Sequence, residues 1–384
     1  MNFHLTEEQQ AFADSVRRFA QRELADGALE RAHSRDYPWD IAAKLAHQGM
    51  LGITIKEEDG GIGGTLMDAV IAIQELALVC PKSADVVQAG NFGPIRTFAE
   101  YASPELKERF LPDLMAGKSL LALGMSEPGA GSAVTELRTS AVEDGDHYVI
   151  NGSKVFSTHS PNANTFLIYV RFGPGLDGIG SVIVERGTPG FEVGQPSAFM
   201  SGEEWSQLYF TDCRIPKANV LLGPGGFKKQ ISGFNVERIG NSSRSLALGR
   251  HAFNVAREHC LTREQFGRPL CEFQGLQWKF AEMAVKLEAA QLLLYRAAVN
   301  ADGGLPSAYE TSVAKLSCNL AGWEVSNEAL QAMGGYGYSS EALVEYCVKR
   351  TRGWMIAGGS IEILKNRIAE DVFGRRFDQR LPKA

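Results

Sequence analysis

A stretch without proline, residues 235–268, limits most strongly what this chain can fold into. Its apolar side chains recur every three or four residues, which is the spacing of an α-helix with one buried face. The apolar positions are Leu246, Leu248, Ala252, Phe253, Val255 and Ala256. Because a helix rises about 1.5 Å per residue, Glu237 near its start and Arg263 near its end would lie roughly 39 Å apart. The sequence therefore predicts one long helix that serves two separate sites.

The composition argues against several classes of protein. The chain has 384 residues, of which 44% are hydrophobic and 22% charged, so we expect a globular protein of two or three domains. Its net charge of -6 gives no electrostatic reason to bind nucleic acid. No apolar run approaches the roughly 20 residues of a membrane span. The six cysteines form no CxxC pair, and no targeting peptide is recognisable, so we expect no metal site and a cytoplasmic location.

Periodicity divides the chain into three parts. Residues 1–117 show helical patterns, residues 118–222 show short β-branched segments with turn signals such as Asn151-Gly152, and residues 223–384 are helical again. In the first part, helices are expected from Thr6, a typical cap, and over residues 40–47, 66–79 and 104–115. In the last part, they are expected over residues 280–301 and 316–333, followed by the stop signal Gly334. The sequence thus predicts an α+β protein with three domains at those boundaries.

Four motifs occur in an order that is typical of one family. They are Ser126-Glu127-Pro128-Gly129-Ala130-Gly131-Ser132, Ile150-Asn151-Gly152-Ser153-Lys154, the run from Thr262 to Pro269, and Gln331-Ala332-Met333-Gly334-Gly335-Tyr336-Gly337-Tyr338. Over nearly its whole length the chain resembles the acyl-CoA dehydrogenases, which are FAD-dependent. The resemblance implies an N-terminal helical domain, a middle β-barrel-like domain and a C-terminal four-helix bundle. It also implies removal of two hydrogens from the α and β carbons of an acyl-CoA thioester.

The resemblance further implies which residues bind the FAD and the acyl-CoA substrate. In the middle part the expected cofactor contacts are Met125, Ser126, Gly131, Ser132, Phe156, Ser157 and Thr158. A second set, expected to reach the FAD of a neighbouring subunit, comprises Arg263, Gln265, Phe266, Gln274, Gln331, Gly334 and Gly335, and Ser360 and Glu362 follow near the C-terminus. Expected substrate contacts are Ser132, Phe234, Asn235, Arg238 and Gly359. Cofactor contacts between subunits imply an oligomer, and a homotetramer is expected, with a heterotetramer left open.

The catalytic base is the position at which this chain departs from most of the family. Most members have a glutamate where this chain has Gly358, which offers a backbone N–H to the thioester oxygen but no carboxylate. Glu237 matches the position from which isovaleryl-CoA and long-chain members supply their base. A glutamate on a helix is more commonly solvated or ion-paired, but the missing carboxylate at 358 favours catalysis. We expect Arg238 beside it to be a partner that could lower the pKa of Glu237.

Three interpretations follow. The first is a dehydrogenase that passes electrons to an electron-transferring flavoprotein, with room at Gly358 for a branched, cyclic or polar acyl group. The second is a reductase that resembles crotonobetainyl-CoA reductase, which shares the sequence Gly-Gly-Ser at this point, or another elimination such as desulfination. The third is an FAD-binding subunit of a heterotetramer whose partner supplies the catalytic site. The segment Gly202-Glu203-Glu204-Trp205 has no role that the sequence predicts.

Overall fold

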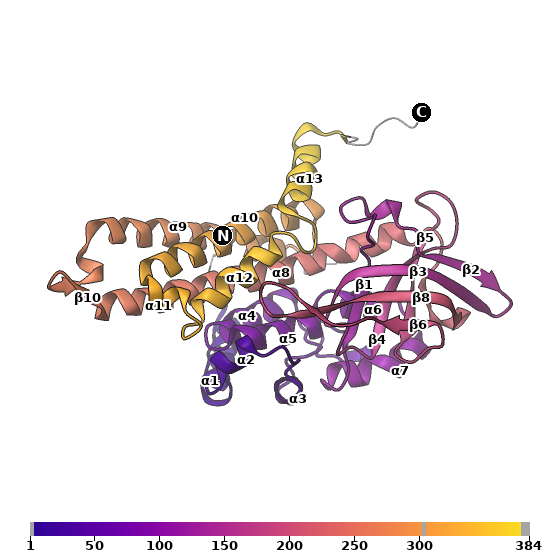
Figure 1. The fold of residues 1–384 in the computed structure, drawn as a ribbon, viewed down its shortest axis with the longest axis horizontal. Coiled ribbons are helices and arrows are strands. Elements are labelled where there is room, and N and C mark those ends of the chain that lie inside the picture. The colour runs from indigo at the N-terminus through magenta and orange to yellow at the C-terminus, as the bar shows by residue number, and fades with distance from the viewer. Residues whose placement is uncertain (1–3, 302–304, 378–384) are drawn as a thin grey trace.

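The computed structural model describes residues 4–301 and 305–377, in which helices are followed by a sheet and then by a second set of helices (Figure 1). The sheet lies at one end of the molecule. Helix α8 (Phe227–Thr262) extends from it to the opposite end, where strand β10 (Glu264–Gln265) lies. Helix α13 (Ile361–Phe373) projects away from the other helices. The predicted long helix is therefore confirmed, and it connects the two ends of the molecule.

Seven helices form the N-terminal part from residue 4, where the described chain begins. They are α1 (Glu7–Glu23), α2 (Ala28–His33), α3 (Trp39–His47), α4 (Leu66–Ala77), α5 (Pro81–Asn91), α6 (Pro94–Tyr101) and α7 (Pro104–Met115), with a single 3-10 turn at η1 (Glu57–Asp59). Thr6 caps α1 in a reciprocal pair with Gln9, as its sequence predicts. Prolines open α5, α6 and α7 at a position where no backbone N–H is needed. Helices α2, α5 and α6 were not predicted from the sequence.

The middle part is a sheet of nine strands. They are β1 (Leu121–Gly124), β2 (Ser140–Asp144), β3 (His147–Thr158), β4 (Thr165–Arg171), β5 (Ile179–Glu185), β6 (Phe191–Val193), β7 (Ser197–Ala198), β8 (Glu204–Pro216) and β9 (Val220–Leu222). Two 3-10 turns interrupt it, η2 (Val134–Glu136) and η3 (Lys217–Asn219). The strand order is β6-β8-β3-β2-β4-β5-β9, with β1 paired to β4 and β7 paired to β8.

The prediction of a barrel-like middle domain needs correction, because the sheet does not close. Its terminal strands β6 and β9 do not pair with each other within the described residues. In addition, β2 and β4 share only one residue pair, Ser140 with Arg171, and β1 pairs with the first four residues of that edge of β4, Thr165 to Ile168. Register shifts along β3 and β8 bend the two longest strands. The sheet is therefore strongly curved and open rather than a barrel.

The C-terminal part is a bundle of four helices, as expected. Helices α8, α9 (Gln274–Val299), α10 (Ala308–Met333) and α12 (Val344–Trp354) pack together, with α10 in contact with the other three. Shorter elements are β11 (Arg268–Pro269), η4 (Leu270–Glu272) and α11 (Gly335–Tyr338). Helices α8 and α10 approach closely because Gly322 lacks a side chain, since a Cβ there would lie 2.3 Å from the backbone oxygen of Ser245.

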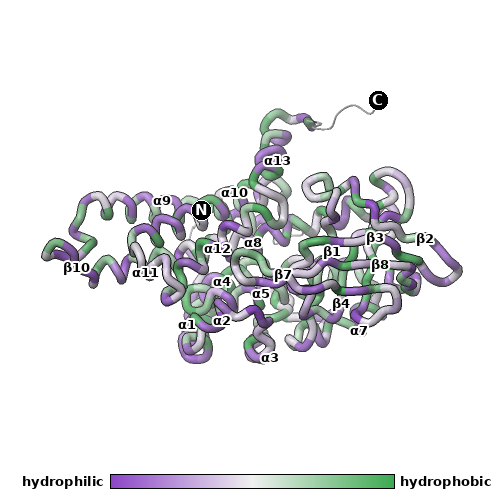
Figure 2. The backbone as a smooth tube through the Cα atoms, in the orientation of Figure 1, coloured by the Kyte–Doolittle hydropathy of each residue, from purple (hydrophilic) through white to green (hydrophobic). Residues whose placement is uncertain are grey.

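Hydropathy follows this architecture. Helix α4 is largely hydrophobic and mostly buried, whereas the hairpin at β10 is largely hydrophilic (Figure 2). Among the described helices, none is both long enough and apolar enough to cross a membrane.

Candidate active site

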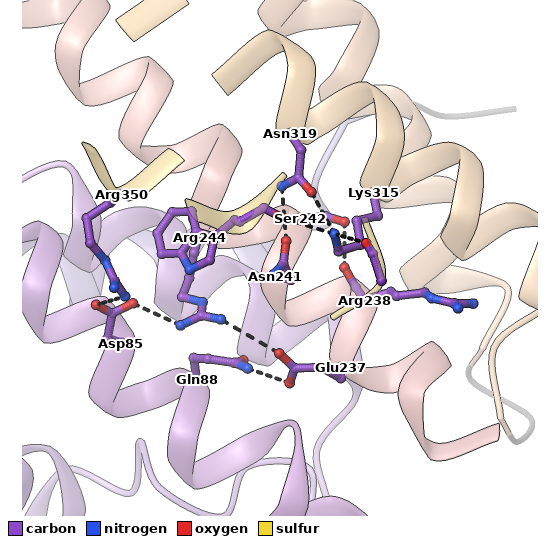
Figure 3. Close-up of polar contacts among 12 residues, drawn as sticks. Asp85, Gln88, Glu237, Arg238, Asn241, Ser242, Arg244, Lys315, Asn319 and Arg350 are labelled. Carbon is purple, nitrogen blue, oxygen red and sulfur yellow. Dashed lines mark hydrogen bonds and ion pairs between the residues drawn. The ribbon is translucent and has the colours of Figure 1, made fainter. Parts of the chain in front are cut away.

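Glu237 points from α8 towards the N-terminal helices and is held there by α5. Its side chain is only 19% exposed. Gln88 donates from Nε2 to Oε2 of Glu237 over 2.6 Å. Gly93 makes room for the carboxylate, because a Cβ at that left-handed position would lie 2.9 Å from Oε2. Figure 3 shows the carboxylate between Gln88 and Arg244. These contacts fix one orientation of the carboxylate.

The surroundings of Glu237 favour its protonated form. Burial raises the pKa of Glu237, while Arg244, Gln88 and Lys315 oppose that rise without cancelling it. The contact with Arg244 is loose, with 3.7 Å between Nη2 and Oε1. A carboxylate that is partly removed from water and only weakly paired is a stronger base than a solvated one. The site can therefore accept a proton from a weakly acidic carbon.

The prediction that Arg238 is the partner of Glu237 is wrong. Arg238 extends to the other side of α8 (Figure 3), where Nη1 donates to Asn235 Oδ1 at 3.0 Å and lies 3.4 Å from Ser312 Oγ. Burial and the charge of Arg367 lower the pKa of Arg238 to about 10. Consecutive residues point about 100° apart on a helix, whereas residues seven apart lie on one face. The arginine that approaches Glu237 is accordingly Arg244.

Lys315 holds the turn that carries Gly358. Its fully buried ammonium group donates to Asn319 Oδ1 at 2.9 Å and to the backbone oxygens of Trp354 and Gly359 at 3.0 Å. Burial lowers the pKa of Lys315 to about 7, with Arg238 adding to that effect. Gly358 has a φ of 70°, and a Cβ there would lie 3.5 Å from Cε of Lys315, an ordinary contact. The turn is therefore fixed, while a Cβ at 358 would fit in ordinary contact with Lys315 and Asn241.

A chain of charges connects Glu237 to the middle part. Asp85 accepts from Arg244 Nη1 at 3.0 Å and from Arg350 Nη2 at 2.7 Å, and Arg350 also pairs with Glu203. Burial alone would raise the pKa of Glu203, but Arg350 and His159 hold it well below its usual value. This observation gives Glu203, in the segment without a predicted role, a place in the contact between the sheet and α12.

The loop after β1 is held from beneath by a buried ion pair. Lys154 Nζ lies 2.8 Å from Glu127 Oε1, and Glu127 also accepts from the backbone and hydroxyl of Thr139. Burial lowers the pKa of Lys154 to about 8, while Glu127 opposes that effect. Above this pair the loop is open, because nothing lies within 4 Å of a Cβ at Gly129 or Gly131. A flat ligand could therefore lie against the main chain of residues 125–132.

The end of β3 presents an aromatic ring beside this loop. Phe156 adopts a positive φ of 56° and is 59% exposed, with its ring centroid 4.7 Å from that of Trp205. Ser157, by contrast, is buried and its hydroxyl donates to the oxygen of Leu123 at 2.9 Å, so only its backbone can face a ligand. The backbone of Val155 donates to the oxygen of Ser126, which connects the strand to the loop. The seven expected cofactor residues of the middle part thus lie in one region.

The second set of expected cofactor residues lies at the opposite end of α8. Arg263 is exposed, and its side chain forms no ion pair or hydrogen bond with any residue that the structure describes. Phe266, at the tip of the β10–β11 hairpin, is 93% exposed. His259 in the last turn of α8 stacks on Tyr336, which brings the hairpin close to Gly334 and Gly335. Gln265, Gln274 and Gln331 are also exposed at this end. One chain therefore does not bring the two sets together.

The remaining expected site residues have contacts within the chain. Asn235 is buried and donates to the oxygen of Pro306, and Phe234 is half-buried beside it. Ser360 caps α13 by accepting from the N–H of Ile363. Glu362 lies in the first turn of that helix, exposed, where the helix dipole favours a negative charge. Gly359 and Ser132 are placed on the turn after α12 and on the open loop, respectively.

Several residues of this site were not predicted from the sequence. Gln88 and Asp85 lie on α5, about 150 residues before their partners, and Lys315 lies on α10. Arg244 could have been found, because seven residues separate it from Glu237 on one helix face. Nothing in the sequence marks the other three residues as parts of the site.

Comparisons with known proteins bear on this arrangement. Models of the acyl-CoA dehydrogenase N-terminal, middle and C-terminal domains match residues 6–118, 122–213 and 224–373. An acryloyl-CoA reductase (NADH) of Anaerotignum propionicum is 36% identical over 98% of this chain and 97% of its own length. The chain belongs to the acyl-CoA dehydrogenase family.

Other members of the acyl-CoA dehydrogenase family are similar to this chain. A 3-sulfinopropanoyl-CoA desulfinase of Advenella mimigardefordensis is 34% identical over 99% of this chain and 96% of its own length. The solved structure of butyryl-CoA dehydrogenase from Megasphaera elsdenii superposes with a TM-score of 0.91 at 31% identity, and it covers 97% of this chain and all of the other. Family members with different reactions thus share this fold.

Proposed function

We propose that this protein is an FAD-dependent acyl-CoA dehydrogenase that uses Glu237 as its catalytic base. The observation that carries the proposal is the buried Glu237 carboxylate with its raised pKa, near a turn that has no carboxylate at position 358. Lys315 and Asn241 connect Glu237 to this turn, because both lie within 4 Å of a Cβ built at Gly358. The charge of Lys315 acts on Glu237, and Asn241 follows Glu237 one turn later on α8.

In this mechanism each residue has a separate task. Gln88 holds Oε2 of Glu237, which leaves Oε1 to accept the proton from the α carbon. The backbone N–H of Gly358 orients and polarises the thioester oxygen, which acidifies that proton. FAD, when bound, accepts the hydride that leaves the β carbon. Lys315 keeps the Trp354–Gly359 turn in place through two backbone oxygens.

The residues that are present fit FAD. The open glycine loop and the exposed Phe156 can take the flat ring system, since stacking on phenylalanine remains possible where the family usually has tryptophan. Arg263 has no acidic partner among the described residues, and a guanidinium pairs well with the oxygens of a pyrophosphate. Because Arg263 and Phe156 belong to opposite ends of the molecule, a second copy of the chain would have to supply one of them.

A homotetramer is the assembly that we propose. Helix α9 carries four exposed apolar residues at intervals of seven, namely Trp278, Val285, Leu292 and Val299. This spacing places them along one helix face, which a further copy of the bundle could cover. The division into domains at 117 and 222 also remains a proposal. All six cysteines are free thiols, which supports a cytoplasmic location.

For the substrate we propose a thioester with a branched, cyclic or polar acyl group, because Gly358 leaves room near the α carbon. The electrons would pass to an electron-transferring flavoprotein. Equal rates with straight-chain and branched thioesters would contradict this substrate assignment.

The test is anaerobic reduction of the flavin by a panel of acyl-CoA thioesters, measured as the loss of visible absorbance of the flavin. Butyryl-CoA, isobutyryl-CoA, isovaleryl-CoA and cyclohexanecarboxyl-CoA make up the panel. We expect one branched or cyclic thioester to bleach the wild-type protein and to leave Glu237→Gln oxidised. Glu258→Gln, which changes an exposed glutamate on the same helix, is the matched control and should react normally.

An enoyl-CoA reductase is the second candidate, and the similarity to the acryloyl-CoA reductase favours it. Glu237 would then donate the proton that it accepts in the forward direction. This candidate is preferred if no saturated thioester bleaches the flavin while an enoyl-CoA reoxidises the prereduced protein. The presence of Glu237 argues against the interpretation as an FAD-binding subunit of a heterotetramer. If the protein purified alone were inactive and poor in flavin, that interpretation would be favoured instead.

A further inference from the structure

The guanidinium of Arg244 lies between two carboxylates and favours one of them. Nη1 donates to Oδ1 of Asp85 at 3.0 Å, whereas Nη2 lies 3.7 Å from Oε1 of Glu237, beyond hydrogen-bond distance. Figure 3 shows this arrangement, with Gln88 next to the other oxygen of Glu237. The side chain of Arg244 is mostly buried, with 11% of it exposed. Asp85 therefore receives a hydrogen bond from this guanidinium, whereas Glu237 faces its other terminal nitrogen without one.

Arg244 also contacts the turn that carries Gly358. Its guanidinium carbon lies 4.8 Å from the ring centroid of Trp354, and that of Arg350 lies 4.8 Å from the same ring. Trp354 ends α12, and its backbone oxygen accepts from Lys315. Arg244 is thus in contact with the ring at the start of the turn and close to the carboxylate on α8.

Asp85 is in turn held on both sides. Its second oxygen accepts from Arg350 at 2.7 Å, and Arg350 is buried and paired with Glu203. A carboxylate with two guanidinium partners can satisfy both without moving. Asp85 therefore fixes where the charge of Arg244 lies.

We propose that Asp85 and Arg244 are positioning residues: Asp85 holds the guanidinium over Trp354 and away from Glu237, which keeps the base free to accept a proton. The proposal rests on the proposed function only in taking Glu237 as the base. Direct pairing of Arg244 with Glu237 would stabilise the carboxylate and weaken it as a base. Asp85 thus keeps the guanidinium 3.0 Å from its own carboxylate and 3.7 Å from that of Glu237.

The charged groups around Glu237 come from four elements. Helix α5 contributes Asp85, α8 contributes Arg244, α10 contributes Lys315 and α12 contributes Arg350, while Gln88 on α5 is neutral. Arg238 faces the other side of α8. Of these groups, Arg244 is the arginine that contacts Glu237, with 3.7 Å between Nη2 and Oε1, and Asp85 is its other carboxylate partner.

The test is an infrared titration of the Glu237 carboxyl group in the purified holoenzyme. The spectrum of Glu237→Gln is subtracted at each pH, so no substrate is needed. In Asp85→Asn, which keeps the shape of the side chain, Arg244 is free to turn to Glu237, and the midpoint should move to lower pH by about one pH unit. In Arg244→Met the positive charge is lost, and the midpoint should move to higher pH. Arg244→Lys, which keeps the charge, is the second variant to measure if Arg244→Met does not fold. Its midpoint should stay within a few tenths of a pH unit of wild type.

Opposite shifts in Asp85→Asn and Arg244→Met support the proposal if the downward shift of Asp85→Asn disappears in the double variant Asp85→Asn/Arg244→Met, because loss of the Asp85 charge alone would lower the midpoint in both backgrounds. Unchanged midpoints in these two single variants, shifts in the same direction, or a downward shift that persists in the double variant overturn it. Glu75→Gln is the matched control, because it removes the 2.7 Å partner of Arg17 far from this network and should leave the midpoint unchanged. The proposed function fails separately, if Glu237→Gln is bleached by a thioester as fast as the wild type. In that case the titration still decides whether Asp85 and Arg244 control the carboxyl group.

Discussion

The two ends of α8 differ in whether their charged side chains find partners within one chain. At one end Glu237 is mostly buried, with Gln88, Arg244 and the neighbouring Lys315 around it. At the other end Arg263 and Phe266 are exposed, and the guanidinium has no partner among the residues that the structure describes.

This difference shows how one helix can contribute to two kinds of chemistry. A base needs partial removal from water, which only packing within the fold can provide at a fixed distance. A phosphate-binding arginine needs the reverse, an exposed fork of donors whose partner arrives from outside. We therefore expect changes at the Glu237 end to affect proton transfer, and changes at the Arg263 end to affect cofactor retention.

The largest effect should come from separating these two functions in one mixed oligomer. Glu237→Gln should lose about 10²- to 10⁴-fold in the rate of flavin reduction, because a general base is removed. Arg263→Met should instead release FAD, with roughly tenfold to hundredfold weaker binding through loss of a charge-assisted contact. If each site combines Glu237 of one chain with Arg263 of another, co-expression of the two variants should restore about one quarter of the sites at limiting FAD. Arg257→Met, which changes an exposed arginine near the end of α8, is the control.

No recovery in the mixed oligomer would mean that both residues serve the same chain's cofactor. In the control mixture of Glu237→Gln with Arg257→Met, the active sites should equal the share of Arg257→Met chains, which keep Glu237. A larger number of active sites would indicate a different assembly. Flavin content and the rate per bound flavin, measured separately, distinguish the two effects.

The next effect concerns the support beneath Gly358. In Lys315→Met the oxygens of Trp354, Gly359 and Asn319 lose a buried donor, and each unsatisfied group costs about 1–3 kcal/mol, so we expect a loss of about 3 kcal/mol or more. Lys286→Met in the same bundle removes only an exposed pair with Glu324 and should cost less than about 1 kcal/mol. Urea unfolding of both variants measures the difference. Equal costs would show that Lys315 does not hold the turn.

The sequence predicted the order of helices and sheet because periodicity and turn residues are local signals. Thr6 as a cap, Gly334 as a stop and the long helix containing Glu237 all follow from such signals. The open sheet was not predictable in the same way, because closure depends on which edges meet, and a single pair joins β2 to β4.

Within the site, the sequence predicted the candidate base but not what surrounds it. Adjacency in sequence favours Arg238 as the partner, whereas helix geometry places Arg244 on the face of Glu237. Gln88 and Asp85 come from α5, a helix that the sequence analysis did not predict, and reach the site only through tertiary packing. Long-range contacts of this kind leave no pattern in a single sequence.

A third prediction uses pH to distinguish the ends of α8. The rate of flavin reduction should fall about tenfold for each pH unit below the raised pKa of Glu237, because only the carboxylate is a base. Stability should change in the opposite direction. Since the folded-state pKa lies above the unfolded value, the contribution of Glu237 to stability is present below the unfolded pKa and is lost as pH rises through the folded one.

FAD retention should not follow either curve, because a guanidinium is effectively always charged in proteins. Stopped-flow bleaching, thermal unfolding and flavin content, measured on one series of buffers, provide the three curves. In Glu237→Gln the stability curve should lose its slope in this window. A stability curve identical to that of the wild type would assign the slope to another group.

The smallest effect should come from filling the position that Gly358 leaves open. An added Cβ makes only ordinary contacts, at 3.5 Å with Cε of Lys315 and 3.8 Å with Nδ2 of Asn241, so the cost of Gly358→Ala should come mainly from its φ of 70° and amount to about 1 kcal/mol. Gly374→Ala is the matched control, because its φ is 62° and nothing lies within 4 Å of its Cβ. A much larger cost at 358 than at 374 would show that the space beside Lys315 is not free. If the costs are equal, the new methyl group should slow flavin reduction by branched thioesters more than by butyryl-CoA, because it occupies the room that a branch at the α carbon needs.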